Sequence, residues 1–242
     1  MTDTWDTIAD WYAARIRTGS PMHTFARDLL LSHLPADLHG QHALDLGCGE
    51  GLITRALAAR GATALGVDPA PRMIGHAQAA HPTDAHATSA RYAVDDARTL
   101  ATVPGATMHW VTAGLSLNNV PDLPAALSAV SRVLRPGGHL VLTVPHPCFE
   151  APHAGWTSDD NGTPRRLIGD YLTEGFWRSS DPEAARRAGN QHRTLSTYLT
   201  TLIAHGFTID ATAEPAPDTA LAAARPHRAG LPPFLLVRAY WA

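Results

Sequence analysis

The segment 42–51, His-Ala-Leu-Asp-Leu-Gly-Cys-Gly-Glu-Gly, decides the fold of this chain. Its first half is a short apolar run typical of a buried strand, and the helical pattern Leu-Ile-Thr-Arg-Ala-Leu-Ala-Ala-Arg follows at 52–60. Between them, Gly47, Gly49 and Gly51 allow the backbone to turn sharply and to approach a ligand without side-chain interference. The first amides of the next helix lack intrahelical partners and can bind a polar or anionic group. We therefore predict a ligand loop here; the alternative is a plain tight turn.

Short apolar runs alternate with helical stretches beyond this segment, at 62–68, 91–96, 109–115 and 139–145. Such alternation indicates β-α-β units, and hence a Rossmann-like α/β fold with a mostly parallel sheet and helices on both faces. Two further runs, at 206–215 and 233–242, are expected to form a closing antiparallel pair, which makes seven strands. Ligands of such sheets bind outside the carboxyl ends of the strands, so the residues after each run are candidate site residues.

Two other parts flank the alternating pattern. Residues 1–40 read as two helices, and the apolar side chains of the first share one face: Trp5, Ile8, Tyr12 and Ile16. The second helix starts with Ser20 and Pro21 as its cap and is expected to bury Phe25 and Leu29. Residues 146–190 are rich in Pro, Gly, Trp and Arg and show no sustained period, which indicates an insertion or lid.

Composition excludes several classes of function. The two cysteines, Cys48 and Cys148, form no CxxC pair and no HExxH motif is present, so neither a disulfide framework nor a metal site is expected. All 19 basic residues are arginines, which removes mechanisms that need a lysine. A net charge of -3 lacks the basic footprint of a nucleic-acid binder. Without a signal peptide or a long apolar segment, the chain is expected to be cytoplasmic and not membrane-bound, with a homodimer left open.

Acidic residues stand at the ends of three predicted strands. Asp45 ends the first, and Asp68, followed by Pro69, ends the second. In Rossmann-like sheets an acid at the second position accepts hydrogen bonds from the two ribose hydroxyls of a bound nucleotide. The alternative is a helix N-cap before Pro69, and both roles are compatible. After the third strand, Asp96 and Ala97 are placed where a carboxylate accepts from an adenine amine; taken alone, this would be a solvated loop.

These elements, together with the Leu-Arg-Pro-Gly-Gly turn at 134–138, resemble the class I S-adenosylmethionine-dependent methyltransferases over roughly residues 42–145. The resemblance implies S-adenosylmethionine as the cofactor. It also implies cofactor-binding roles for residues at each strand end and on the N-terminal helix: Gly47, Gly49 and Gly51 at the methionine and ribose moieties, Asp68 with Pro69 at the ribose, Asp96 with Ala97 at the adenine, Asp45 at the methionine amine, Gly114 beneath the sulfonium and Tyr12 closing over the cofactor.

A closer resemblance, to a bacterial group of small-molecule methyltransferases, rests on His146-Pro147-Cys148-Phe149 and on the segment 192–195, His-Arg-Thr-Leu. It extends the likeness over nearly the whole chain. The chain then divides as a single methyltransferase domain, 1–242, with four parts: an N-terminal helical cap (1–40), a cofactor-binding core (41–145), a lid or substrate insertion (146–190) and a C-terminal helix with an antiparallel strand pair (191–242).

Three alternatives compete with this interpretation. An NAD-dependent oxidoreductase shares the strand, the turn and the second acid, but its GxGxxG fingerprint requires glycine where this chain has Leu52. A non-catalytic S-adenosylmethionine-binding protein would keep the same contacts, and the release of S-adenosylhomocysteine would distinguish it. Methylation of nucleic-acid or protein amines usually shows an Asn-Pro-Pro-Tyr type motif after the fourth strand, where this chain has Leu-Ser-Leu-Asn-Asn at 115–119. Small-molecule acceptors are therefore favoured.

Four residues are candidates for the chemistry. His146 follows the fifth strand at the ligand edge and is the first candidate for a general base; Tyr12, His23 and His192 are weaker ones. For each of the 14 histidines, a structural role is the alternative. Aromatic residues gather in the segments expected to flank the crevice: Trp5, Trp11, Phe149, Trp156, Tyr171, Phe176 and Trp177. They favour a flat, hydrophobic acceptor such as an indole-bearing compound of specialised metabolism, unless they only pack the lid onto the sheet.

Overall fold

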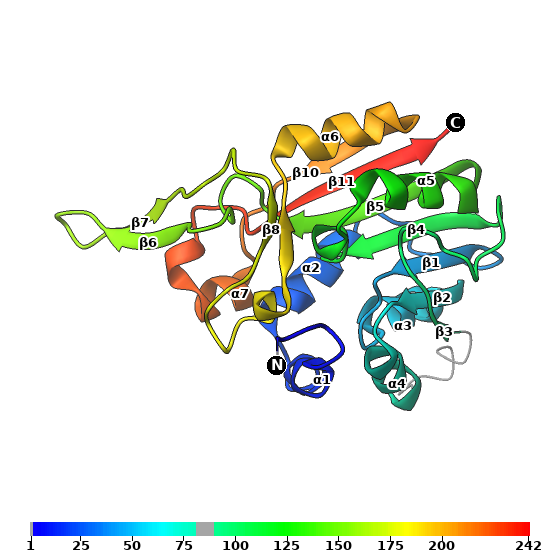
Figure 1. Ribbon diagram of the computed structural model, residues 1–242, viewed down its shortest axis with the longest axis horizontal. Helices are drawn as coiled ribbons and strands as arrows, with labels where there is room; N and C mark the ends of the chain where they lie inside the picture. Colours follow the sequence, from blue (N-terminus) through cyan, green and yellow to red (C-terminus); the bar gives the residue numbers. More distant parts are fainter. Residues whose placement is uncertain (1, 81–89) are drawn as a thin grey trace.

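A seven-stranded sheet forms the centre of the molecule in the computed structural model, which describes residues 2–80 and 90–242 (Figure 1). The strand order is β10-β11-β5-β4-β1-β2-β3. All neighbours pair in parallel except β11, which is antiparallel to both β5 and β10. The predicted fold class and the closing antiparallel pair are confirmed. The strands are β1 (His42–Leu46), β2 (Thr63–Asp68), β3 (Ala90–Val94), β4 (Met108–Gly114), β5 (Leu134–Pro145), β10 (Phe207–Ala213) and β11 (Phe234–Trp241).

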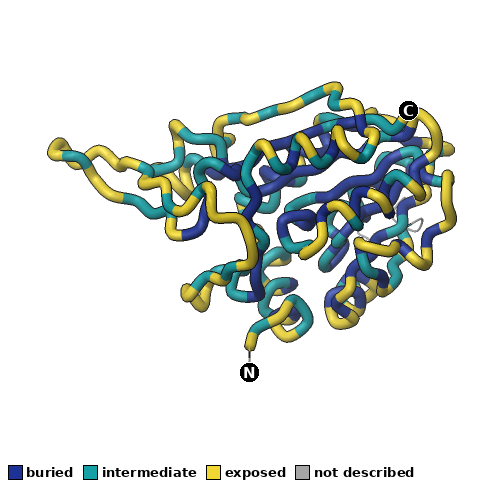
Figure 2. Tube along the Cα trace, turned by 45° about the horizontal axis from the view of Figure 1, so that its top comes forward, coloured by how far each residue is buried: buried dark blue, intermediate teal, exposed yellow. Residues whose placement is uncertain are grey.

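Hydrophobic clusters on both faces of the sheet hold the helices against it. Because successive strand residues point to opposite faces, Leu44 and Leu46 of β1 join one cluster and Ala43 joins the other. The first cluster includes α5 (Leu123–Val133) and α6 (Leu195–Ala204); the second includes α2 (Pro21–Leu31), α3 (Leu52–Ala59) and α7 (Thr219–Ala224). Figure 2 shows the inner strands of this sheet as the most deeply buried part of the chain.

The N-terminal arm forms the two predicted helices, α1 (Ala9–Arg17) and α2. As expected, α2 buries Phe25 and Leu29, and α1 contacts α4 (Pro71–Ala79). The predicted cap at Ser20 differs in detail. Ser20 occupies the N-cap position with Pro21 after it, but its hydroxyl lies 2.7 Å from Nδ1 of His23 and bonds no helix amide.

The insertion contains short strands that the sequence pattern did not reveal. Figure 1 shows the hairpin of β6 (Gly155–Ser158) and β7 (Pro164–Leu167) extending beyond the edge at which β4 and β5 end. A second pair joins β8 (Gly175–Trp177) to β9 (Asn190–His192). Short 3-10 helices complete the described chain: η2 (Leu117–Asn119), η3 (Ala185–Ala188) and η4 (Pro226–Arg228).

The fifth strand begins earlier than the apolar run at 139–145 indicated. β5 starts at Leu134, and the predicted turn at 134–138 lies inside it as an irregular stretch. Leu134 pairs with Met108 and His139 with Trp110, so β5 has extra residues relative to β4. Gly137, at φ +76°, accommodates this bulge. Among the described residues, no helix has the length and apolar character needed to cross a membrane.

Candidate functional site

The glycine turn after β1 has the geometry of a close-packed ligand loop. Gly47, Gly49 and Gly51 all have left-handed φ angles, of +69°, +54° and +89°. The amides of Gly47 and Cys48 donate to the carbonyl of Val67 at 2.8 and 2.9 Å, which fixes the turn against the end of β2. A Cβ on Gly47 would lie 2.5 Å from Cβ of Ser116. The turn therefore needs glycine both for its backbone conformation and for its contact with the loop after β4.

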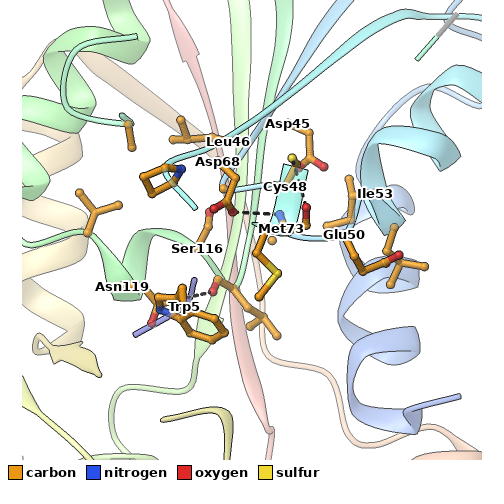
Figure 3. A pocket seen from close by; sticks show the side chains of 18 of the residues that line it. Trp5, Asp45, Leu46, Cys48, Glu50, Ile53, Asp68, Met73, Ser116 and Asn119 are labelled. Atoms are coloured by element: carbon orange, nitrogen blue, oxygen red, sulfur yellow. Dashed lines mark hydrogen bonds between the residues drawn. The ribbon is translucent and has the colours of Figure 1, made fainter. Parts of the chain in front are cut away.

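A cavity of about 270 Å³ opens above this turn (Figure 3). Its walls come from the ends of β1, β2 and β4, the loop after β3, and the N-terminal arm. Every residue predicted to bind the cofactor lines it except Gly51: Tyr12, Asp45, Gly47, Gly49, Asp68, Pro69, Asp96, Ala97 and Gly114. Gly51 instead lies at the N-cap of α3, where a Cβ would meet the side chains of Arg55 and Tyr92.

Asp68 ends β2 with its carboxylate held by two backbone amides. One oxygen accepts from Gly49 N–H at 3.0 Å and the other from Ala70 N–H at 2.9 Å, and Figure 3 shows it directed toward the turn. Burial raises the pKa of Asp68, and these two hydrogen bonds partly offset that rise. Since each carboxylate oxygen has a second lone pair, both can still accept from a ligand. The residue at the N-cap of α4 is Ala70, so Asp68 braces the turn before the helix rather than capping it.

Asp45 is the most deeply buried acid of the site, with 1% of its surface exposed. Its carboxylate accepts from the hydroxyls of Thr54 at 2.7 Å and Thr112 at 3.1 Å, which joins β1 to α3 and β4. Burial raises the pKa of Asp45 to about 6, against the lowering effect of these hydrogen bonds. The group is thus poised to ionise near neutral pH, and a cation placed in the cavity would favour the ionised form.

The two acids after β3 have different surroundings. Asp95 is buried and accepts from the amides of residues 96, 101 and 102, so its role is to shape the loop. Asp96 lines the cavity and is paired with Arg98 at 2.5 Å, whose hydrogen bonds lower the pKa of the Asp96 carboxyl. Ala97 is buried beside it. Asp96 therefore stays ionised and retains acceptor capacity toward a ligand.

The N-terminal arm supplies an aromatic wall. The Tyr12 ring lies edge-on to Trp5 and to His23, with ring centroids 5.4 Å apart in each pair. A Cβ on Gly49 would lie 3.7 Å from the Tyr12 ring, so α1 covers the glycine turn. Burial raises the pKa of the Tyr12 hydroxyl and lowers the pKa of His23 to about 4. His23 is therefore neutral at physiological pH.

The loop after β4 forms the floor between the glycine turn and the arm. Gly114 faces Ile53, whose side chain would contact any Cβ added there. Leu115 has φ +55°, an uncommon value for leucine, and its carbonyl accepts from Nδ2 of Asn119 at 3.0 Å. The hydroxyl of Ser116 is buried in the cavity wall with no hydrogen-bond partner among the described residues. Sequence reasoning missed Ser116 and Asn119, because no local motif marks them.

The structure does not bring His146 or His192 to this cavity. Nε2 of His146 lies 2.6 Å from the Glu214 carboxylate, its Nδ1 accepts from Cys148 N–H at 3.3 Å, and 2% of the residue is exposed. His192 is also buried and bonds the carbonyl of Tyr171 at 2.7 Å. Position after a strand suggested His146 as a base, but its ring contacts Glu214 and Phe149 and does not line the cavity. Its position does not support that role.

A second cavity of about 860 Å³ adjoins the first and shares part of its wall, namely Trp5, Tyr12, His23, Leu115 and Asn119. The insertion and η4 supply the opposite wall, including Trp156 and Trp177. The buried Glu150 lies there and pairs with three arginines: Arg166, Arg186 and Arg228. The sequence analysis did not single out this group, since its members are up to 78 residues apart.

The other predicted aromatic residues are mainly structural. Trp11 packs under the guanidinium groups of Arg15 and Arg187, and Phe149 packs on His146. Tyr171 contacts His192, and Phe176 is 58% exposed. No cluster of metal-ligating side chains occurs in residues 2–80 or 90–242.

Comparisons with known proteins match the fold of this chain. A family model described as a methyltransferase domain covers residues 44–142. The crystal structure of an S-adenosylmethionine-dependent methyltransferase from Mesorhizobium loti is 34% identical, with a TM-score of 0.75 over 88% of this chain and 96% of that chain. A putative S-adenosylmethionine-dependent methyltransferase from Listeria monocytogenes is 27% identical, with a TM-score of 0.73 over 90% of this chain and 98% of that one.

A curated relative, the ubiquinone biosynthesis O-methyltransferase of Paracidovorax citrulli, is 35% identical over 103 residues, which is 43% of either chain. The match spans less than half the length of that relative.

Proposed function

Because the chain belongs to the S-adenosylmethionine-dependent methyltransferases, we propose that it methylates a small, flat, aromatic metabolite in the cytoplasm, with the cofactor in the 270 Å³ cavity and the acceptor in the adjoining one. S-adenosylmethionine supplies a methyl group activated on a sulfonium. The observation that carries the proposal is the pair of cavities separated by the wall of Trp5, Tyr12, His23, Leu115 and Asn119.

The residues around the first cavity fit the cofactor. Asp68 keeps two free acceptor sites on a buried carboxylate, which suits the two ribose hydroxyls. The buried Ser116 hydroxyl has no hydrogen-bond partner in the described part of the chain, and such groups are satisfied by ligands or water. Asp45 is placed to hold the cationic amine, directly or through water, and Asp96 with Ala97 to bind the adenine. Gly47, Gly49 and Gly114 give the ligand close access to the backbone.

We assign His23 to a hydrogen bond with the reacting hydroxyl or amine of the acceptor. It lines both cavities, and Nδ1 is held by the Ser20 hydroxyl at 2.7 Å, which orients the ring. With its pKa lowered to about 4, the imidazole is neutral at pH 7 and can accept a hydrogen bond from a hydroxyl or amine. Tyr12 packs against it and covers the glycine turn, so it positions the reactants and excludes water.

An aromatic acceptor agrees with the composition of the second cavity. Trp5, Trp156, Trp177 and Phe234 contribute to its walls, and ligand pockets of this kind favour flat apolar groups. The name of the curated relatives describes transfer to oxygen in quinone biosynthesis, which supports an aromatic hydroxyl as the class of acceptor tried first. The segments at His146–Phe149 and 192–195 support membership of the bacterial small-molecule group.

Calorimetry with S-adenosylmethionine, followed by a mass-spectrometric screen of aromatic acceptors, tests the proposal. Asp68→Ala should weaken cofactor binding roughly ten- to a hundredfold, because hydrogen bonds to a charged group contribute about 1.5–3 kcal/mol. The matched control is Asp37→Asn, an exposed acid that contacts His39. Equal affinity of the folded Asp68→Ala protein and the control would refute the assignment. Cofactor binding without any methylated product across the screen would instead favour a non-catalytic protein.

A further inference from the structure

The second cavity has an excess of positive charge around a single carboxylate. The carboxylate belongs to Glu150, which is 8% exposed. Its Oε1 accepts from Arg228 at 2.5 Å and from Arg166 at 3.3 Å. Its Oε2 accepts from Arg186 at 3.1 Å. Three guanidinium groups thus share one carboxylate, which leaves two positive charges in excess (three minus one). Among the described residues that line this cavity, Glu150 is the one acidic side chain, whereas Arg178 and Arg225 add further positive charge.

This arrangement exceeds what a structural ion pair requires. One arginine in a forked contact satisfies a buried carboxylate, and each additional buried cation costs desolvation energy unless an anion compensates it. Burial opposes ionisation of Glu150, but the three arginines outweigh it and lower its pKa. Burial and the charges of Arg228 and Arg186 likewise lower the pKa of Arg166 despite the opposing effect of Glu150. The positive charge of the three arginines is therefore only partly neutralised by Glu150.

Aromatic rings hold the arginines in place at the cavity wall. The guanidinium of Arg166 lies 5.0 Å from the Trp156 ring centroid, and that of Arg228 lies 5.8 Å from the same ring. Arg186 lies 5.6 Å from the Trp177 ring. Arg166 also donates to the carbonyl of Phe149 at 2.6 and 2.8 Å. The arginines are therefore positioned by contacts that do not depend on Glu150 alone.

Two polar atoms in the same wall lack partners within the described chain. Nε1 of Trp177 is a buried donor without an acceptor. Oδ1 of Asn118, a residue 7% exposed, is a buried acceptor without a donor. Both residues line the cavity. Buried polar atoms without partners are rare in native proteins, and a bound polar ligand is one way in which they are satisfied. They therefore point independently to a ligand with polar groups.

We propose that this cavity recognises the methyl acceptor through an oxyanion, a carboxylate or a phosphate on an aromatic scaffold, bound by Arg166, Arg186 and Arg228. The inference rests on the proposed function, and it narrows the substrate class to aromatic acids. Planar guanidinium groups match the geometry of carboxylate and phosphate oxygens. The tryptophans that stack on the arginines lie where they contact the aromatic part of the same ligand.

Binding of three small probes to the full chain saturated with S-adenosylhomocysteine tests the proposal. The probes are 4-hydroxybenzoate, its neutral amide 4-hydroxybenzamide, and phenyl phosphate, each titrated by calorimetry. We expect the tighter-binding of the two anions to bind roughly tenfold or more tightly than the amide, because the arginines form stronger hydrogen bonds with a charged oxyanion than with a neutral amide. Whichever of the two anions binds more tightly shows whether the cavity prefers a carboxylate or a phosphate. Equal binding of the amide and both anions overturns the proposal.

Variants separate anion recognition from a structural role. Arg186→Met should weaken anion binding about tenfold and leave the amide unchanged, whereas the matched control Arg165→Met, whose side chain is 63% exposed and pairs with Asp159, should change neither. Glu150→Gln should tighten anion binding, since it removes the competing internal carboxylate. Equal effects of Arg186→Met and Arg165→Met, or weaker anion binding in a folded Glu150→Gln protein, overturn the proposal. Failure here with intact S-adenosylhomocysteine binding would leave the proposed methyl transfer standing.

Discussion

Single residues in the glycine turn differ in what they require of the backbone and of the space around it. Gly47 has both a left-handed φ and the Ser116 side chain within reach of a Cβ, whereas Gly40 has φ +72° with no neighbour within 4 Å. A comparison of alanine variants at Gly47 and Gly40 therefore separates the cost of the left-handed backbone from the cost of the steric contact. Both effects act through the folded turn.

We predict that Gly47→Ala lowers the free energy of unfolding by roughly 2–4 kcal/mol, because left-handed strain and an overpacked contact add. Gly40→Ala should lose only about 1 kcal/mol, from strain. Chemical denaturation of both variants measures the difference. Equal losses would mean that the turn relaxes away from Ser116 and that its close packing is unimportant.

His146 and His23 illustrate how two histidines near the same strand ends differ in function. His146 is bonded through both ring nitrogens, whereas His23 lines both cavities and is bonded through Nδ1. We predict that His146→Gln keeps turnover within about threefold of the wild type and lowers stability by about 1–3 kcal/mol. His23→Gln should lower turnover by roughly tenfold, because the neutral His23 imidazole, with its pKa lowered to about 4, orients the acceptor through a hydrogen bond.

Steady-state kinetics with the acceptor found in the screen, together with thermal unfolding, distinguishes the two. A large rate loss in a stable His146→Gln protein with cofactor binding intact would restore His146 as the base.

Among the elements, β1, α3 and β4 meet at the Asp45 carboxylate through Thr54 and Thr112. The pKa of Asp45 is raised to about 6 by burial, so folding favours its neutral form. Below about pH 4 the group is neutral in both states and has no effect. As the pH rises from 4 to 6, the unfolded chain ionises first and is stabilised. Above pH 6 the full penalty persists.

Asp45→Asn should therefore become more stable relative to the wild type as the pH rises from 4 to 7. The change is on the order of 3 kcal/mol, because each tenfold change in proton affinity is worth about 1.4 kcal/mol. Urea unfolding of both proteins at several pH values measures it. A difference in stability that is independent of pH would show that Asp45 ionises normally in the folded protein.

How much of the fold was predictable depends on the element. The inner strands of the central sheet are largely buried and appear as nearly continuous apolar runs, so these strands and the closing antiparallel pair could be predicted, whereas their order in the sheet was not. The strands of the insertion are three or four residues long and partly exposed, so no period marks them. Leu134 was placed in a turn because Pro136 and Gly137 follow it, yet pairing with Met108 extends the strand.

The candidate site was predictable to a different extent. The residues of the first cavity follow strand ends, a position that sequence reveals, and most of them line one cavity. The arginines around Glu150 come from β7, η3 and η4, and no local spacing joins them. For His146, proximity to a strand end fixes the position of the backbone but not the direction of the ring, which contacts Glu214 and Phe149 in the structure.

On the scale of the whole molecule, the N-terminal arm and the insertion enclose the carboxyl ends of the strands from different sides (Figure 1). The arm contributes Trp5, Tyr12 and His23 to both cavities, and the insertion contributes Trp156 and Trp177 to the larger. Segments far apart in the sequence thus build the proposed acceptor site, while the central sheet carries the cofactor residues.

The position of β11 between β5 and β10 has a consequence for how the protein is made. On the ribosome β10 emerges before β11, yet β10 is an edge strand of the sheet and, among the described strands, pairs with β11 alone. Until residues 234–241 emerge, β5 presents an open edge and β10 has nowhere to pair, and such edges template aggregation. A chain truncated before Phe234 should therefore precipitate on expression while the full chain remains in solution, as centrifugation of cell lysates would show. The nascent protein is thus most dependent on chaperones before β11 has paired with β5 and β10.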